Sequence, residues 1–282
     1  MRPRILPTAW KLLVVSVVYL ALMFFGHLPD HLILFPTRAP IDAGAAARKT
    51  IPFENGDLEI WTAQSQLARQ QGRADVFILR FYGNADRADR WPAIEAEMWN
   101  DRAVEIWGMN YPGFGGSTGP ARLARIGPAA VAAFDALKRE AADAPIVVFG
   151  TSIGATAALH VAASRPMEIT GLIAQNPPPL REMILRQFGW WNLWLLAGPV
   201  ALQIPRDLDC IANAKATRTS AIFLLAEKDE IVAPRFHRLV VQAYAGEKRI
   251  IELHGAHHND PIAGAALANL SHALDWLLGK AR

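Results

Sequence analysis

The sequence predicts an α/β fold with a mostly parallel central sheet and helices on both faces. Three observations predict it: short apolar runs alternate with helix-like stretches, turn residues bound each run, and 52% of the 282 residues are hydrophobic. Buried parallel strands are expected at 76–81, 104–109, 146–149, 172–174, 222–225 and 250–253. Helices are expected at 89–99, 127–140, 154–164, 234–245 and 261–278.

An antiparallel hairpin is expected before this alternation. Two apolar-rich segments, 51–54 and 58–61, flank Asn55-Gly56, the dipeptide that favours a tight hairpin turn. The later part of the chain contains neither an internal repeat nor a low-complexity linker. We therefore expect one domain over residues 32–282, with an insertion at about 177–216.

Composition excludes several classes of protein. The high hydrophobic fraction excludes a disordered chain, and the single cysteine, Cys210, excludes a disulfide framework or a cysteine-based zinc site. The net charge is +3 and the pI about 9.2, but no basic tract is present that would follow a nucleic acid. Nucleic-acid binding is therefore not expected.

The N-terminal residues 1–31 predict a membrane anchor. The 18 residues from Leu12 to Pro29 carry no charge when His27 is neutral, enough for about 27 Å of helix. A cleaved signal peptide is the alternative, but no small-residue cleavage site directly follows the run. Arg2 and Arg4 precede it, so a single-pass anchor with the catalytic domain on the outer side of the membrane is expected.

A nucleophile elbow is the clearest chemical signal. Gly150-Thr151-Ser152-Ile153-Gly154 matches G-x-S-x-G between an apolar run and an Ala-rich helix, the strand–turn–helix context in which such a serine is exposed. A second match surrounds Ser117, but that serine lies in a Gly/Pro-rich loop without a strand directly before it. Ser152 is therefore the predicted nucleophile, and Ser117 is expected to be a loop or capping serine.

A serine nucleophile needs a base and a carboxylate that orients the base. In this type of fold the order along the chain is serine, acid, histidine, each at the carboxyl end of a later strand. The segment after 221–225 offers Glu227, Asp229 and Glu230, of which Asp229 has the turn-like context expected of the acid. The segment after 250–253 contains three histidines, His254, His257 and His258. Any of them could be the base, and with Asp260 they also permit a metal site, which is the weaker interpretation.

As an ordered set, these motifs resemble the α/β-hydrolase superfamily. Within it, the chain is similar to membrane-anchored, single-pass serine hydrolases that include Bem-type proteins and protein depalmitoylases. The likeness covers roughly residues 32–278. The segments that carry it, besides the elbow, are 34–38, 81–85, 110–117, 228–232 and 258–260.

The resemblance implies further roles. The histidine directly before Asn-Asp is the base in that family, which selects His258, and the backbone N–H groups of Asn84 and Ile153 would form the oxyanion hole. The family usually has His-Gly-Asn-Ala where this chain has Tyr82-Gly83-Asn84-Ala85. Tyr82 cannot reproduce the bracing role of an imidazole, so the rate or the shape of the substrate pocket would differ.

The insertion predicts a small apolar cap. Trp190, Trp191 and Trp194 fall within five residues of it. They predict either an ordinary packed helix or a lid that forms an acyl pocket with Tyr82 and rests at a membrane interface.

These features together predict a membrane-tethered serine hydrolase of carboxylic esters or thioesters, with Ser152, Asp229 and His258 as its catalytic triad. Neither a cofactor nor a metal is expected. The expected partners are a small-molecule or lipid-like acyl substrate and membrane lipid. A peptidase, an acyltransferase and a catalytically silent binding scaffold remain alternatives.

Overall fold

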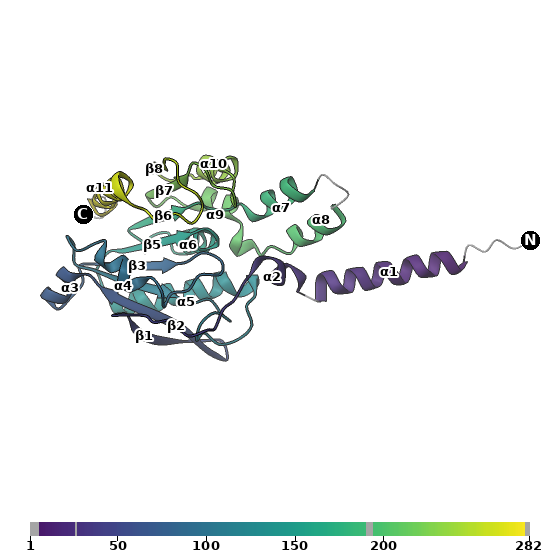
Figure 1. Ribbon diagram of the computed structural model, residues 1–282, viewed down its shortest axis with the longest axis horizontal. Coiled ribbons are helices and arrows are strands. Elements are labelled where there is room, and N and C mark those ends of the chain that lie inside the picture. Colours follow the sequence, from purple (N-terminus) through teal and green to yellow (C-terminus); the bar gives the residue numbers. More distant parts are fainter. Residues whose placement is uncertain (1–5, 26, 190–193, 280–282) are drawn as a thin grey trace, which may run out of the picture.

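The computed structural model describes residues 6–25, 27–189 and 194–279 (Figure 1). Its strands are β1 (Ala47–Phe53), β2 (Gly56–Gln64), β3 (Val76–Phe81), β4 (Val104–Met109), β5 (Ile146–Thr151), β6 (Gly171–Gln175), β7 (Ala221–Ala226) and β8 (Lys248–Leu253). Its helices are α1 (Leu6–Phe25), α2 (Leu28–Ile33), α3 (Gln66–Gln71), α4 (Pro92–Glu97), α5 (Leu123–Ala141), α6 (Ile153–Ser164), α7 (Leu180–Phe188), α8 (Trp194–Leu202), the 3₁₀ helix η1 (Arg206–Leu208), α9 (Cys210–Ala216), α10 (Pro234–Ala243) and α11 (Gly264–Gly279).

All eight of these strands form one sheet in the order β1-β2-β4-β3-β5-β6-β7-β8. The β1–β2 and β2–β4 pairs are antiparallel, and every pair from β4 to β8 is parallel. The predicted hairpin is confirmed, but its turn is Glu54-Asn55 instead of Asn55-Gly56, since Phe53 pairs with Gly56 and Gly56 begins β2. Because β3 lies between β4 and β5, the direction in which the chain winds reverses there, and such a point in a parallel sheet commonly holds a ligand site.

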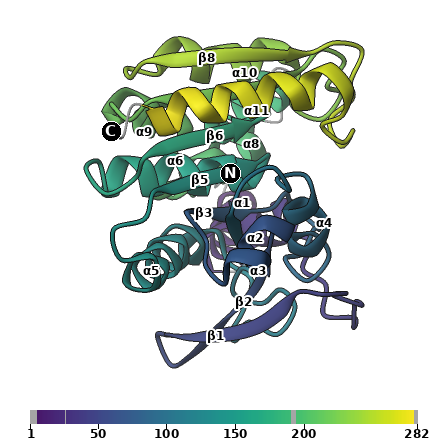
Figure 2. The same cartoon turned by 90° about the vertical axis from the view of Figure 1, so that its left-hand side faces the viewer.

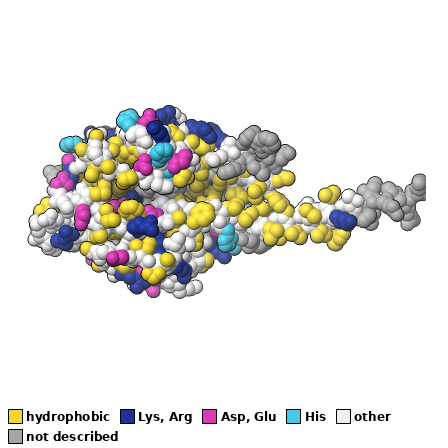
Figure 3. All heavy atoms as spheres, in the orientation of Figure 1, with side chains coloured by type: hydrophobic (Ala, Val, Ile, Leu, Met, Phe, Trp, Pro, Cys, Tyr) yellow, Lys and Arg dark blue, Asp and Glu magenta, His cyan; other side chains and the backbone are white. Residues whose placement is uncertain are grey.

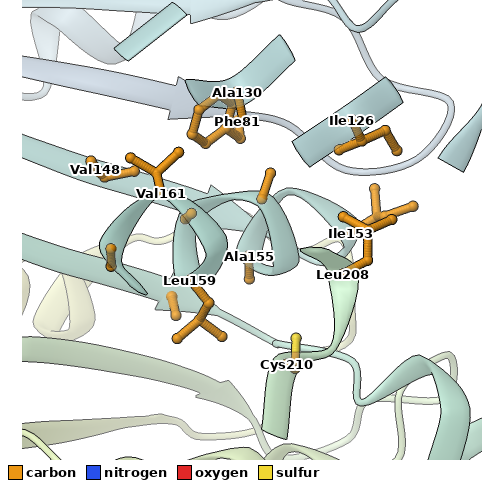
Figure 4. Close-up of a cluster of buried hydrophobic side chains, with 14 of the residues drawn as sticks. Phe81, Ile126, Ala130, Val148, Ile153, Ala155, Leu159, Val161, Leu208 and Cys210 are labelled. Atoms are coloured by element: carbon orange, nitrogen blue, oxygen red, sulfur yellow. The ribbon is translucent and has the colours of Figure 1, made fainter. Parts of the chain in front are cut away.

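Helices cover both faces of the sheet, as expected (Figure 2). The larger buried cluster joins one face to side chains of α5, α6, α9 and α10, and the smaller one joins the other face to α4 and α11. Figure 4 shows the larger cluster around α6, where Leu159, Val161 and Phe81 are buried with neighbours from η1 and α9. Helices therefore pack against both faces of the sheet at the edge where β5 ends.

The segment between β6 and β7 contains α7, α8, η1 and α9 and coincides with the insertion expected at about 177–216. In Figure 1, α7 and α8 lie together at the end of the molecule from which α1 projects. Side chains along α1, including Leu12, Leu13 and Val15, are largely exposed and form part of an apolar surface (Figure 3).

The prediction of a membrane-spanning anchor is wrong. Among residues 6–25, 27–189 and 194–279, none of the helices combines the length and apolar character needed to cross a bilayer. The uncharged run from Leu12 to Pro29 is not one helix, because α1 ends at Phe25 and His27 has a left-handed φ of 48° before α2 begins. The expected single-pass topology, with the domain on the outer side of a membrane, depended on this anchor and is therefore wrong as well.

The buried position of Leu159 on α6 generates a stability prediction. Leu159→Ala removes a fully buried side chain and leaves a cavity, so we expect the free energy of unfolding to fall by about 3 kcal/mol. Urea denaturation followed by circular dichroism measures the change. Met167→Ala, which truncates a side chain that is 93% exposed, is the matched control and should change stability by less than about 0.5 kcal/mol.

Candidate functional site

The turn between β5 and α6 holds Ser152 in a strained backbone conformation, with φ 54° and ψ −124°. Small residues on either side make this turn possible. A Cβ atom at Gly150 would lie 2.1 Å from the carbonyl oxygen of Gly154, and one at Gly154 would lie 2.2 Å from the carbonyl oxygen of Phe81. The glycines of the G-x-S-x-G pattern are therefore required by the close approach of α6 to β3 and β5.

The structure brings the three residues of the predicted triad together. Ser152 follows β5, Asp229 follows β7 and His258 follows β8, and the carboxyl ends of these parallel strands share one edge of the sheet. His258 Nε2 lies 3.0 Å from Ser152 Oγ, and His258 Nδ1 lies 2.6 Å from Asp229 Oδ2. Asp229 and His258 are buried. This arrangement can pass the hydroxyl proton of the serine to an imidazole that a carboxylate holds in place.

Asp229 accepts hydrogen bonds at both oxygens. Oδ1 receives the backbone N–H groups of Ile231 and Val232 at 2.9 and 2.7 Å, while Oδ2 receives His258. Burial alone would raise the pKa of Asp229, but the contacts with His237, His258 and the Val232 backbone outweigh it and hold the pKa well below its ordinary value. The carboxylate is therefore ionised at neutral pH.

His237 on α10 is a neighbour of Asp229 that sequence reasoning missed. Its Nε2 lies 3.1 Å from Asp229 Oδ2, and its side chain is fully buried. It comes eight residues after Asp229 on an amphipathic helix, where a buried histidine resembles any other inward-facing position. No signal in the sequence singles it out.

Asn84 and Ile153 are the residues whose backbone N–H groups the resemblance assigns to an oxyanion hole. Gly83 approaches Ser152 closely, since a Cβ placed on this glycine would lie 3.7 Å from the serine Cβ. The Asn84 side chain accepts the Phe35 N–H at 3.0 Å and thereby holds its loop to the segment after α2. Ile153 is the first residue of α6, where backbone N–H groups have no partner within the helix.

Tyr82 stabilises this loop through bonds different from those of an imidazole. Its hydroxyl donates to Glu95 Oε2 at 3.0 Å, and the Tyr111 hydroxyl donates to its carbonyl oxygen at 2.9 Å. Arg80 donates to the same Glu95 carboxylate at 3.0 Å and to Thr151 Oγ1 at 2.9 Å. Burial and the charge of Glu95 raise the pKa of Tyr82, which keeps its hydroxyl protonated. One network thus joins the loop to the elbow.

A cavity of about 830 Å³ opens beside Ser152 and His258. Residues of β3, β4, β5 and α4 line it together with Phe35, the loop after β3 that contains Tyr82 and Asn84, and the segment after His258. Three tryptophans of the cap were predicted to line a substrate pocket. Trp190 and Trp191 lie outside the described residues, and Trp194 begins α8. Among the described side chains of the insertion, at residues 177–187, 189 and 195–216, none lines this cavity.

The remaining candidates are not brought into the triad. Ser117 is buried, where its Oγ donates to the Asn110 carbonyl at 2.7 Å and accepts the Glu59 N–H at 2.8 Å, so it braces its loop. His257 Nδ1 lies 3.1 Å from Glu230 Oε2, and both side chains are exposed. Among the residues that the structure describes, no group of three or more His, Cys, Asp or Glu side chains is arranged to hold a metal ion.

Comparison with known proteins agrees with the α/β fold. A family model described as alpha/beta hydrolase fold matches residues 77–207. An uncharacterized protein of Mycobacterium tuberculosis is 27% identical over 250 residues, covering 85% of this chain and 84% of that protein. An esterase of Pyrococcus furiosus has a TM-score of 0.63 at 16% identity, over 88% of this chain and 98% of its own. Est1E of Butyrivibrio proteoclasticus, solved with ferulic acid, has a TM-score of 0.64 at 15% identity, over 82% and 98%.

The low pKa of Asp229 generates a pH-dependent prediction. A carboxylate whose folded pKa is depressed stabilises the protein fully above its unfolded pKa of about 4, and this contribution is lost as the pH falls toward the folded value. Asp229→Asn should therefore destabilise the protein most at neutral pH, and the difference from wild type should shrink below about pH 4. Urea denaturation at pH 7, 5 and 3 measures it.

Asp143→Asn, which replaces an exposed carboxylate, is the control for the loss of one negative charge. Its free energy of unfolding should stay close to that of wild type at every pH. A destabilisation by Asp229→Asn that remained constant or increased toward pH 3 would contradict the assignment.

Proposed function

Because the protein belongs to the α/β-hydrolase superfamily, we propose that it hydrolyses carboxylic esters or thioesters with Ser152 as its nucleophile. The observation that carries this proposal is the hydrogen-bonded chain from Ser152 Oγ through His258 to Asp229, with distances of 3.0 and 2.6 Å. The likeness to an esterase supports it at the level of fold.

The proposed reaction has two acyl transfers. His258 Nε2 takes the proton from Ser152 Oγ as that oxygen bonds to the acyl carbon of the substrate, and the carbonyl electrons move onto the oxygen. The tetrahedral intermediate collapses, the ester or thioester bond breaks, and His258 gives the proton to the departing alcohol or thiol. Water then attacks the acyl-enzyme, with His258 taking and returning a proton, and releases the acid and free Ser152.

Asp229 holds His258 in the orientation that this reaction needs. Its Oδ2 contacts His258 Nδ1, so Nε2 is directed toward the serine, and its negative charge stabilises the imidazolium that forms. The hydrogen bonds of Oδ1 with the Ile231 and Val232 backbone prevent the carboxylate from turning away.

The backbone N–H groups of Asn84 and Ile153 are the proposed donors to the developing oxyanion. Ile153 begins α6, so the positive end of the helix dipole also faces the developing charge. Removal of one such donor costs about 3 kcal/mol of transition-state stabilisation in related chemistry. The Arg80–Glu95–Tyr82 network supports this role because it limits motion of the Asn84 loop relative to the elbow.

Labelling with a fluorophosphonate tests the nucleophile. Wild type should form one adduct, located on Ser152 by mass spectrometry, and should hydrolyse p-nitrophenyl butanoate. Ser152→Ala should lose the adduct and lower kcat/KM by about 10⁴-fold or more, because the acyl-enzyme cannot form. His258→Ala should also lose the adduct, since the serine then has no base.

Ser117→Ala is the matched control, because Ser117 lies in the second G-x-S-x-G sequence but braces a loop. It should retain both the adduct on Ser152 and hydrolysis. An adduct on Ser117 would identify a different nucleophile. If folded wild type gave no adduct and no hydrolysis, a binding scaffold would replace the proposed enzyme.

A further inference from the structure

Two consecutive residues at the end of β6, Gln175 and Asn176, join the segments that carry the proposed triad. β6 is buried along its whole length and lies between β5, which leads to Ser152, and β7, which leads to Asp229. The Ser152 N–H donates to the Gln175 carbonyl oxygen at 2.9 Å. The main chain of the proposed nucleophile is therefore held to an interior strand of the sheet.

Asn176 leaves the regular strand conformation, and its side chain continues the hydrogen bonding of the sheet. Its φ is 48°, a left-handed value that asparagine adopts more readily than most other residues. Its backbone N–H still donates to the Leu224 carbonyl of β7 at 2.9 Å. In a regular parallel ladder the Ala226 N–H would donate to the main-chain oxygen of residue 176. Here it donates to Asn176 Oδ1 at 2.9 Å, so the side-chain amide takes the place of a peptide group.

The nitrogen of the same amide holds the proposed base. Asn176 Nδ2 donates to the main-chain carbonyl oxygen of His258 at 3.2 Å, across 82 residues of sequence. Asn176 is fully buried, so this bond is shielded from water. His258 is buried as well, but His257 and Asn259 on either side of it are exposed. The bond therefore ties an otherwise exposed loop, residues 254–260, to the interior of the sheet.

The chemistry of an amide suits these two contacts. A backbone N–H can only donate and a carbonyl oxygen can only accept, so Ala226 and His258 require one acceptor and one donor from the side chain between them. A carboxylate would lack the donor, and glycine would lack both groups. Asn176 does not line the cavity beside Ser152, so it can act on the base but does not touch a substrate there.

We propose that Asn176 is a positioning residue of the triad, which sets the distance between His258 and Ser152. The proposal rests on the proposed function for the reaction. Through Gln175 and Asn176, the end of β6 holds the main chain of the nucleophile on one side and that of the base on the other, while Asp229 orients the imidazole ring. Without the amide, the loop that carries the base loses this anchor. A displacement of about 1 Å in an active site can lower the rate by about 100-fold.

Kinetics of Asn176→Gly with p-nitrophenyl butanoate test this role. Glycine adopts a positive φ without strain, so the turn is retained while both side-chain bonds are lost. We expect kcat to fall by about 10- to 100-fold and KM to stay within about 2-fold, because the residue does not touch the substrate. A raised KM with unchanged kcat would overturn the proposal.

Asn176→Ser separates positioning from the mere satisfaction of backbone groups, and it replaces the glycine variant if that variant does not fold. The hydroxyl is too short to reach both groups, but it leaves room for a water molecule that can bond to the Ala226 N–H and to the His258 carbonyl. Because such a water does not fix the distance between the two loops, kcat should still fall by about 10-fold or more. Wild-type kcat in Asn176→Ser would overturn the proposal.

Ser65→Ala is the matched control. Ser65 is also fully buried, and its Oγ likewise accepts a strand N–H, that of Val104, and donates to a loop carbonyl, that of Arg102. This bridge lies where β4 begins, at the edge of the sheet opposite the triad. Ser65→Ala should leave kcat within about 3-fold of wild type. A fall as large as that of Asn176→Gly would mean that the loss of any buried bridge has this effect, and would overturn the proposal.

Crystal structures of wild type and Asn176→Gly separate the positioning role from the proposed reaction. In the variant, the distance between His258 Nε2 and Ser152 Oγ should exceed the hydrogen-bonding limit of about 3.2 Å. An unchanged distance would reject the positioning role even if wild type hydrolysed the ester. An increased distance would support it even if wild type hydrolysed none.

Discussion

The close approach of α6 to the ends of β3 and β5 is the constraint on which the rest of the structure depends. Gly154 contacts the carbonyl of Phe81, and Gly150 contacts the backbone of Gly154, at distances that no side chain could share. This approach forces Ser152 to a positive φ and directs its hydroxyl toward His258. It also brings the first turn of α6 beside the Asn84 loop. The strain at one residue is therefore offset by the packing of a whole buried helix.

The second interaction that fixes the geometry of the site is the buried ion pair between Arg80 and Glu95. Its charges lose most of their hydration, and such a pair is stable only when further hydrogen bonds satisfy both partners. Thr151 and Tyr82 supply those bonds, and they belong to the elbow and to the loop before Asn84. The same contacts that compensate for burial thus fix the distance between the nucleophile and the proposed oxyanion donors. Tyr82 participates as a hydroxyl donor, a role that its position in the family's motif does not indicate.

How much of the structure could be predicted depended on the range of each interaction. The strands and the elbow follow from local patterns, and the order Ser152, Asp229, His258 follows from the topology of parallel strands. The selection of His258 needed the family resemblance, because three histidines shared one loop. His237 and the Arg80–Glu95 pair could not be found, since their partners are distant in sequence and their positions look like ordinary core or strand positions. The anchor prediction treated Leu12 to Pro29 as one uncharged run, and hydropathy does not show that α1 ends at Phe25 and α2 begins at Leu28.

The two faces of the sheet have separate tasks in this arrangement. The α5–α6 face fixes the elbow, because its buried side chains hold α6 against β3 and β5. On the opposite face, covered by α4 and α11, Arg80 and Tyr82 bind Glu95 of α4, and Arg80 also binds Thr151 of the elbow. The position of Ser152 is therefore held from both faces of the sheet, by apolar packing of α6 on one face and by this polar network on the other.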